Sequence, residues 1–240
     1  MRLFKPLLAE FLGTFALIFV GAGAATLLAP TQIVAVALAH GFVIMTFAYT
    51  FGKDCGSYIN PALTLSAVVA GEHSARDAAA IIVAQLLGGI LGAQLLALIY
   101  GYGAPHHLGA TLINLDQTTV LGGFLLEAIG TFFLANTMLN TAHRGTAGAL
   151  APFAIGMTVS LCILGFGSIT GGSVNPARTI GPAIASGEYA NIGVYLAAQV
   201  LGAVAAGLAY RFVWRTQDAR APARAPAQFA PSAAGTPGAD

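Results

Sequence analysis

The stretch Asn60-Pro61-Ala62 interrupts an apolar region of the chain, and it returns 115 positions later as Asn175-Pro176-Ala177. Other sequence features repeat with an offset within two residues of this value. Gly41 returns as Gly156, the run that begins at Glu10 returns at Glu127, and the run that begins at Gln85 returns at Gln199. Chance similarity between apolar helices rarely keeps one offset at several separate places. A duplicated membrane protein with an interrupted segment in each half is typical of a binding site or pore at the interface of the repeats.

The composition is that of a membrane protein. Hydrophobic residues make up 57% of the 240 positions and charged residues 8%, with a mean hydropathy of +0.78, whereas soluble domains carry about 25% charged residues. Six apolar stretches, each long enough to cross a hydrocarbon core of ~30 Å, lie at about 7–28, 32–52, 77–101, 120–140, 148–168 and 191–213. Backbone groups in lipid must be paired internally, so these spans are predicted to be helices and the fold to be all-α.

The triplets are predicted to start two short helices. The segments that follow them, Ala62 to about Ala70 and Ala177 to about Ser186, are too short to cross a membrane. Asparagine is a good N-cap, and proline is favoured at the first helical position. Each half also holds three spans, an odd number, which requires the second half to be inverted. We therefore expect two re-entrant half-helices that enter from opposite faces and bring their positive dipole ends together near the midplane.

Charged residues predict the orientation. Apart from Arg178, every Lys and Arg lies at a chain end or in an even-numbered connection, which places both termini in the cytoplasm by the positive-inside rule. We expect one channel domain over residues 1–216, with repeat halves at about 5–105 and 118–215, integral to a bacterial inner (plasma) membrane. The Ala/Pro-rich residues 217–240 are predicted to form a disordered cytoplasmic tail.

With these features the chain resembles the aquaporins of the major intrinsic protein family over about residues 5–215. The resemblance rests on both triplets and on three runs, Ala9-Glu10-Phe11-Leu12-Gly13-Thr14, Ser173-Val174-Asn175-Pro176-Ala177-Arg178 and Gly181-Pro182-Ala183. It implies a homotetramer with one pore in each subunit. The chain departs from the family pattern at Tyr58, where a histidine is usual, and this departure concerns the cytoplasmic mouth of the pore.

The same resemblance implies a selectivity filter made of His40, Ile163, Gly172 and Arg178. Arg178 is an ionisable residue at membrane depth, which is a functional candidate by default. Taken alone, His40 would more often be a hydrogen-bonded core histidine, and Ile163 and Gly172 would be packing residues. The symmetry-related Glu10 and Glu127 are expected to brace the half-helix loops from inside the bundle rather than to carry ions.

The filter set resembles the plant tonoplast intrinsic subfamily, which includes an ammonia-permeable branch. In that branch a loop histidine two residues after a proline joins the filter, and this position corresponds to His107. The alternative for His107 is a solvated loop histidine. These resemblances imply a passive pore for water and neutral ammonia. Water would accept hydrogen bonds from Asn60 and Asn175, while Arg178 repels cations.

Two other transport functions stay open at this stage. A facilitator of glycerol or urea is suggested by the wide ring that Gly172 leaves, although glycerol facilitators have Asp where this chain has Thr179. A coupled secondary transporter would need intramembrane carboxylates, and the candidates are Glu10 and Glu127. The sequence shows no nucleophile–base pair, metal-ligand cluster or phosphate loop. We therefore expect no enzyme activity, cofactor, metal or nucleic-acid partner, and interaction only with water, small neutral solutes, the lipid bilayer and further copies of the chain.

Overall fold

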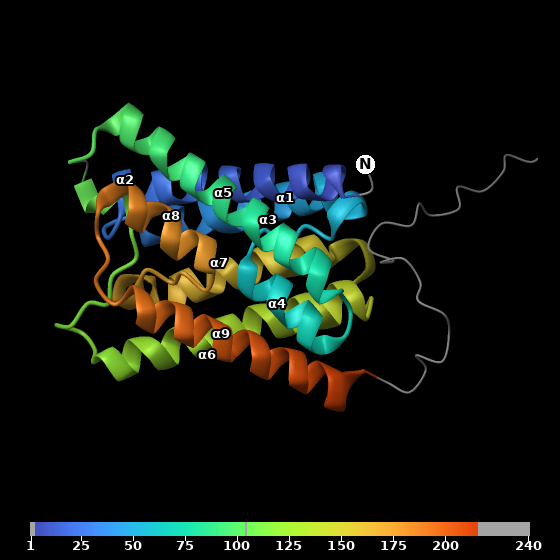
Figure 1. Ribbon diagram of the computed structural model, residues 1–240. Helices are drawn as coiled ribbons and strands as arrows, with labels where there is room; N and C mark the ends of the chain where they lie inside the picture. Colours follow the sequence, from blue (N-terminus) through green and yellow to red (C-terminus); the bar gives the residue numbers. More distant parts are fainter. Residues whose placement is uncertain (1–2, 104, 216–240) are drawn as a thin grey trace, which may run out of the picture.

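The computed structural model describes residues 3–103 and 105–215, and all the regular elements in these ranges are helices (Figure 1). Helical segments long and apolar enough to cross a membrane run over Phe4–Leu28, Ile33–Gly52, Ala75–Tyr100, Val120–His143, Gly148–Thr170 and Ile192–Trp214. The predicted all-α class with six spans is therefore confirmed. The predicted tail over residues 217–240 lies outside the described residues.

Several spans are built from more than one element. The first consists of α1 (Phe4–Ala16), the π-helical turn η1 (Leu17–Ala22) and α2 (Gly23–Leu28), followed by α3 (Ile33–Cys55) and α5 (Ala75–Tyr100). The second half contains α6 (Val120–Met138) with η3 (Leu139–His143), η4 (Gly148–Leu150) with α7 (Ala151–Thr170), and α9 (Ile192–Ala209) with η5 (Tyr210–Trp214). A short turn, η2 (Pro105–Gly109), lies in the long connection between the halves.

The two half-helices are α4 (Pro61–Ala70) and α8 (Pro176–Ser186), which extend from the middle of the bundle toward opposite ends (Figure 1). Asn60 and Asn175 are their N-caps, with extended backbone and side chains that accept the N–H of the second helical residue. Proline occupies the first position of each helix, where its missing N–H is not needed. Two separate local signals thus fix the start of both half-helices at the centre of the fold.

The halves pack as an inverted repeat. In the first half α1 packs on α5, in the second half α6 packs on α9, and α3 meets α7 between the halves. The α3–α7 contact is close because Gly41 faces Gly156: a Cβ added at Gly41 would lie 2.6 Å from the carbonyl oxygen of Gly156. Small residues of this kind allow membrane helices to approach backbone to backbone.

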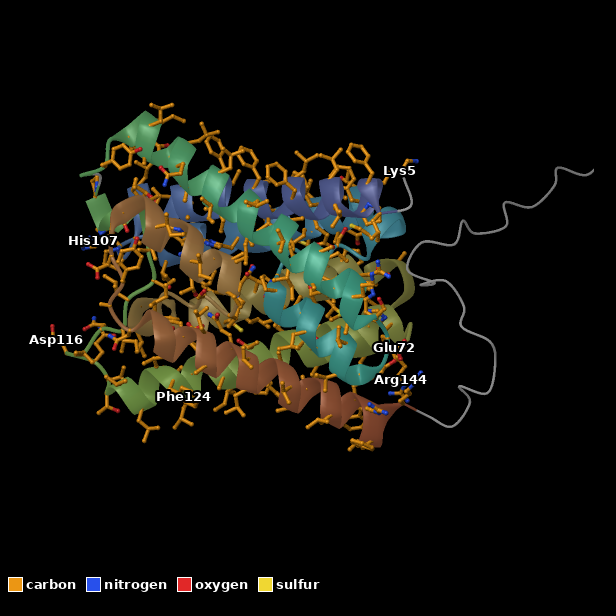
Figure 2. The ribbon with its side chains drawn as sticks, in the orientation of Figure 1. Lys5, Glu72, His107, Asp116, Phe124 and Arg144 are labelled. Atoms are coloured by element: carbon orange, nitrogen blue, oxygen red, sulfur yellow. The ribbon has the colours of Figure 1, made fainter. Side chains whose placement is uncertain are left out.

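The two ends of the bundle differ in their charged side chains. We call the end that holds Lys5, Glu72 and Arg144 the terminal side, because α1 begins and η5 ends there, and the end that holds His107 and Asp116 the loop side (Figure 2).

Candidate functional site

The site is built around two asparagines that are bonded across the centre of the molecule. The Nδ2 atom of Asn60 donates to the carbonyl oxygen of Val174 at 2.8 Å, and Nδ2 of Asn175 donates to that of Ile59 at 2.9 Å. Each Oδ1 caps its own half-helix. An amide carries two N–H donors, so each asparagine keeps a second N–H for a molecule beside it. The crossed bonds also hold the two half-helix N-termini against each other.

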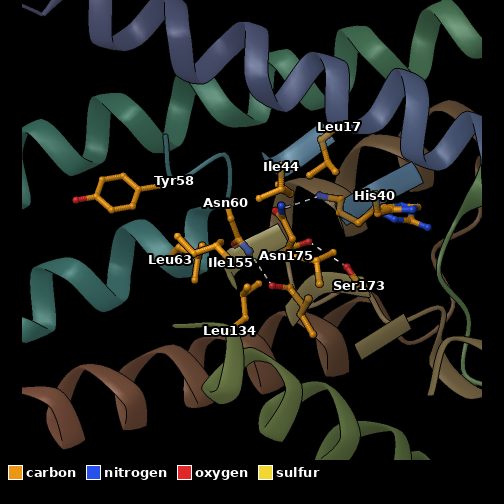
Figure 3. Close-up of a pocket in the computed structure, with 13 residues that line it drawn as sticks. Leu17, His40, Ile44, Tyr58, Asn60, Leu63, Leu134, Ile155, Ser173 and Asn175 are labelled. Atoms are coloured by element: carbon orange, nitrogen blue, oxygen red, sulfur yellow. Dashed lines mark hydrogen bonds between the residues drawn. The ribbon is translucent and has the colours of Figure 1, made fainter. Parts of the chain in front are cut away.

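A narrow central cavity is lined by these two asparagines. It runs from Tyr58 at one end to His40 at the other (Figure 3). The Tyr58 end is on the terminal side, since Tyr58 contacts His143 beside Glu72, and Arg178, which also lines the cavity, lies toward the loop side with His107. Its volume is about 10 Å³, which is close to the smallest space that holds one water molecule. Much of its wall is apolar, from Leu17, Ile44, Leu63, Leu134, Ile155 and Val159. A polar molecule in the cavity therefore finds hydrogen-bonding partners at a few fixed points only.

Arg178 lies where the central cavity meets a wider vestibule of about 250 Å³ on the loop side. Its side chain is 3% exposed, and one terminal nitrogen donates to the carbonyl oxygen of Gly109 at 2.7 Å. Its Nε atom has no hydrogen-bond partner among the described residues. The guanidinium is therefore anchored by the loop at one end and offers a free N–H donor at the other.

His40 lines the central cavity close to Arg178. Its Nδ1 lies 2.8 Å from the carbonyl oxygen of Val36. A carbonyl oxygen can only accept, so Nδ1 carries the proton and Nε2 of the neutral ring is an acceptor. Nε2 is buried and has no partner within the described chain. The ring fits because residue 21 is glycine in the π-helical turn η1: a Cβ there would lie 2.7 Å from the ring.

The other predicted filter residues lie differently. The Ile163 side chain is 1% exposed and packs against Gly172, where an added Cβ would lie 3.0 Å from Cα of Ile163. Neither residue is among those that line the central cavity or the vestibule. Gly172 also has φ +57°, a backbone conformation that favours glycine. His107 lines the vestibule together with Arg178, and no hydrogen bond joins the two within the described residues.

Glu10 and Glu127 bind the loops that carry the triplets. Glu10 accepts the backbone N–H groups of Tyr58 and Ile59 at 2.8 and 2.7 Å, and the side-chain amide of Gln85 at 2.7 Å. Glu127 makes the same kinds of contact. It accepts the backbone N–H groups of Ser173 and Val174 in the second loop, the hydroxyl of Thr170 and the side-chain amide of Gln199. Both carboxylates are at most 1% exposed, and neither lines the central cavity or the vestibule. Their contacts hold the two triplet loops in place.

The structure adds a cluster on the terminal side that the sequence did not indicate. The ring of Tyr58 stacks on His143 at 5.9 Å between centroids and approaches His73 at 5.7 Å. Glu72 lies next to His143, and Arg215 lies next to Glu72 and completes the cluster. Tyr58 was marked only by its departure from a family pattern. His143 is the last residue of η3 and His73 follows α4, and no motif connects them to Tyr58.

Comparisons with known proteins agree with this architecture. Residues 1–210 match the family model described as "Major intrinsic protein". The chain is 36% identical over 226 residues to "Probable aquaporin TIP2-2" of Oryza sativa subsp. japonica, with 89% of each chain covered. It is 36% identical over 213 residues to "Glycerol uptake facilitator protein-like 6" of Lactiplantibacillus plantarum, with 86% of this chain and 97% of that protein covered. The X-ray structure of the aquaglyceroporin from Plasmodium falciparum superposes with a TM-score of 0.75 at 24% identity, covering 88% of this chain and 96% of that one, which supports the fold alone.

Proposed function

This chain belongs to the major intrinsic protein family, and from that premise we propose that it is a passive pore for water and neutral ammonia that excludes protons and ions. Members of the family are passive membrane channels rather than enzymes. The observation that carries the proposal is the pair of crossed asparagines at the centre of a cavity that is otherwise largely apolar.

Water passes the asparagines in a defined orientation. The second N–H groups of Asn60 and Asn175 donate to the oxygen of a molecule beside them, and the two half-helix N-termini favour the same orientation. That molecule's hydrogens then point away from the centre, toward each end of the pore. A proton wire needs every water to accept from one neighbour and donate to the next in a single direction. The central molecule breaks this chain, so protons are excluded while water passes.

Cations are rejected near the loop-side end of the central cavity. Arg178 presents a fixed positive charge there, and the two half-helix N-termini add positive potential at the centre. The described part of the pore wall offers no carboxylate to offset them, because Glu10 and Glu127 are engaged with the loops. Because these two carboxylates bind the loops, they are not available as the ion ligands that a coupled secondary transporter would require.

Ammonia is favoured by an acceptor on His40 and a donor on Arg178, two residues that line the central cavity. His40 Nε2 is an acceptor and Arg178 Nε is a donor, and both are without a protein partner in the described chain. Neutral ammonia has three N–H donors and one lone pair, so it matches both kinds of group. Ammonium has no lone pair and carries a charge that Arg178 repels.

A facilitator of glycerol or urea is the second candidate. The similarity to a glycerol uptake facilitator-like protein and the wide vestibule favour it. The narrow central cavity argues against it. Thr179 stands where glycerol facilitators have Asp, its hydroxyl is bonded to Ser173 at 2.7 Å and to Gln199 at 3.1 Å, and Thr179 lines neither the central cavity nor the vestibule.

The placement in the cell and the assembly belong to the same proposal. We place the protein in a bacterial inner membrane as a homotetramer, with the terminal side facing the cytoplasm. The positive-inside rule supports this orientation. Lys5 and Arg144 lie at the terminal side (Figure 2), and Arg211 and Arg215 lie in and directly after η5, which ends there. Large apolar side chains are exposed along the spans, for example Leu98 and Phe133, and lipid or neighbouring subunits would cover them.

Proteoliposomes test the function. Stopped-flow light scattering should show faster water exchange than in empty vesicles, and a trapped pH dye should show faster alkalinisation after mixing with an ammonium salt. Glycerol should enter slowly. Water flux should not change when proton and sodium gradients are dissipated. Water flux equal to that of empty vesicles would contradict the channel function, and flux that depends on an ion gradient would favour a transporter.

A further inference from the structure

Tyr58 lies at the terminal-side end of the central cavity. It is the lining residue at the opposite end from His40 (Figure 3) and is 5% exposed. Its backbone N–H is fixed by Glu10 at 2.8 Å, so the loop cannot carry the ring away without breaking a buried bond. The central cavity therefore meets an aromatic ring at this end, whereas at the other end Arg178 also lines the vestibule.

The ring of Tyr58 is held from two directions. Its hydroxyl oxygen lies 3.2 Å from Nε2 of His143, and the two rings are nearly parallel, at 11°. His73 lies against it at a ring-centroid distance of 5.7 Å and 32°. Three segments meet at this ring: the first triplet loop, the connection after α4, and the end of η3, which comes from the other half of the chain.

His143 is itself positioned by charged groups. Its Nδ1 lies 4.0 Å from Glu72, which favours a proton on Nδ1 and leaves Nε2 to accept from the Tyr58 hydroxyl. Glu72 is held by Arg215 at 3.4 Å, and Arg215 also donates to the carbonyl oxygen of Ala70 at the end of α4. The orientation of the tyrosine is thus set by a chain of contacts that ends at the half-helix.

We propose that Tyr58 is a second specificity-determining residue, which forms a constriction at the terminal-side end of the pore, with His143 and His73 as its positioning residues. This inference rests on the proposed channel function. The constriction excludes solutes with several heavy atoms, such as glycerol and urea, and passes water and ammonia, which have one heavy atom each. Glycerol exclusion thus depends on this ring as well as on the filter around Arg178.

The test measures glycerol and urea permeability relative to water in proteoliposomes that carry the full chain. Tyr58→Ala, and Tyr58→Leu should the alanine variant fold poorly, should raise the glycerol-to-water ratio several-fold. Tyr58→Phe keeps the ring and should raise it much less. The matched control is Tyr189→Ala, an exposed tyrosine on the loop side, which should leave the ratio unchanged.

The histidines are tested by rescue. His143→Ala removes the stacked ring and the hydroxyl partner and should raise the glycerol-to-water ratio, while His143→Phe restores the stack and should return most of the exclusion. A purely structural role would change the amount of folded protein in both variants without changing this ratio. An unchanged ratio in Tyr58→Ala and Tyr58→Leu would overturn the inference. Absence of water flux in the parent protein is a separate result, which would overturn the proposed function instead.

Discussion

Glu10 and Glu127 make equivalent contacts in the two halves of the molecule. Each carboxylate accepts the backbone N–H groups of the two residues directly before a triplet, which are Tyr58 and Ile59 for the first and Ser173 and Val174 for the second. The repeat seen in the sequence is therefore also a repeat of hydrogen bonding. Each brace fixes the loop that presents an asparagine to the pore.

We expect Glu127→Ala to destabilise the protein more than it alters selectivity. The substitution leaves two buried N–H groups and a threonine hydroxyl without their acceptor, and the cost is on the order of 3 kcal/mol. Thermal unfolding in detergent should show a clear fall in the transition temperature. Asp116→Ala, at an exposed loop position, is the control and should leave the transition unchanged. A variant of normal stability that had lost ion-coupled transport would contradict the bracing role.

Much of this architecture could be predicted because the signals are local and repeated. Asparagine followed by proline defines a helix start, and the shared offset shows that both starts belong to one inverted repeat. The orientation of a side chain around a helix axis is different. The place of Ile163 in the filter rests on the family resemblance and stays a prediction; the structure shows that Ile163 packs on Gly172, a contact that no local signal in the sequence predicts.

The cluster around Tyr58 could not be predicted for another reason. Tyr58 and His143 are 85 positions apart, and their contact depends on where the span Val120–His143 ends. That end is a π-helical turn, and apolar periodicity does not reveal such turns. Contacts of this range follow from the packing of whole helices, so a single sequence carries no separate signal for them.

Mercurials should inhibit water flux weakly. Cys162 is 4% exposed, its Sγ faces the carbonyl oxygen of Gly130 at 3.8 Å, and it does not line the central cavity or the vestibule. Modification at this site would not place a mercury atom in the path of water. Stopped-flow measurements before and after treatment check this, with Cys162→Ser expected to respond as the parent does. Full, reducible block that disappears in Cys162→Ser would show that this thiol reaches the pore.

His73 should make the terminal side more stable at neutral than at acidic pH. Burial lowers the pKa of His73, an effect that Asp77 partly opposes. A histidine with a lowered folded-state pKa takes up protons more readily when unfolded, so its contribution to stability is present above about pH 6.5 and is lost as the pH falls. The parent transition temperature should therefore fall more steeply between pH 7 and pH 5 than that of His73→Gln. The exposed His106→Gln serves as the control, and parallel curves for parent and His73→Gln would refute the expectation.

Ammonia selectivity should depend on the acceptor that His40 presents. His40→Phe keeps a ring of similar size against Gly21 but removes Nε2, so a permeating ammonia loses one of its two partners while Arg178 still repels cations. Dye-loaded proteoliposomes mixed with an ammonium salt should alkalinise more slowly with this variant than with the parent, and water flux should fall less. The His107→Phe variant tests whether the vestibule contributes as well. A comparable loss of alkalinisation rate would place His107 in the ammonia path, and an unchanged rate would show that it is a solvated loop histidine. Equal alkalinisation with and without the parent protein would leave a pore for water alone, because the donor at Arg178 and the acceptor at His40 would then serve only to orient water.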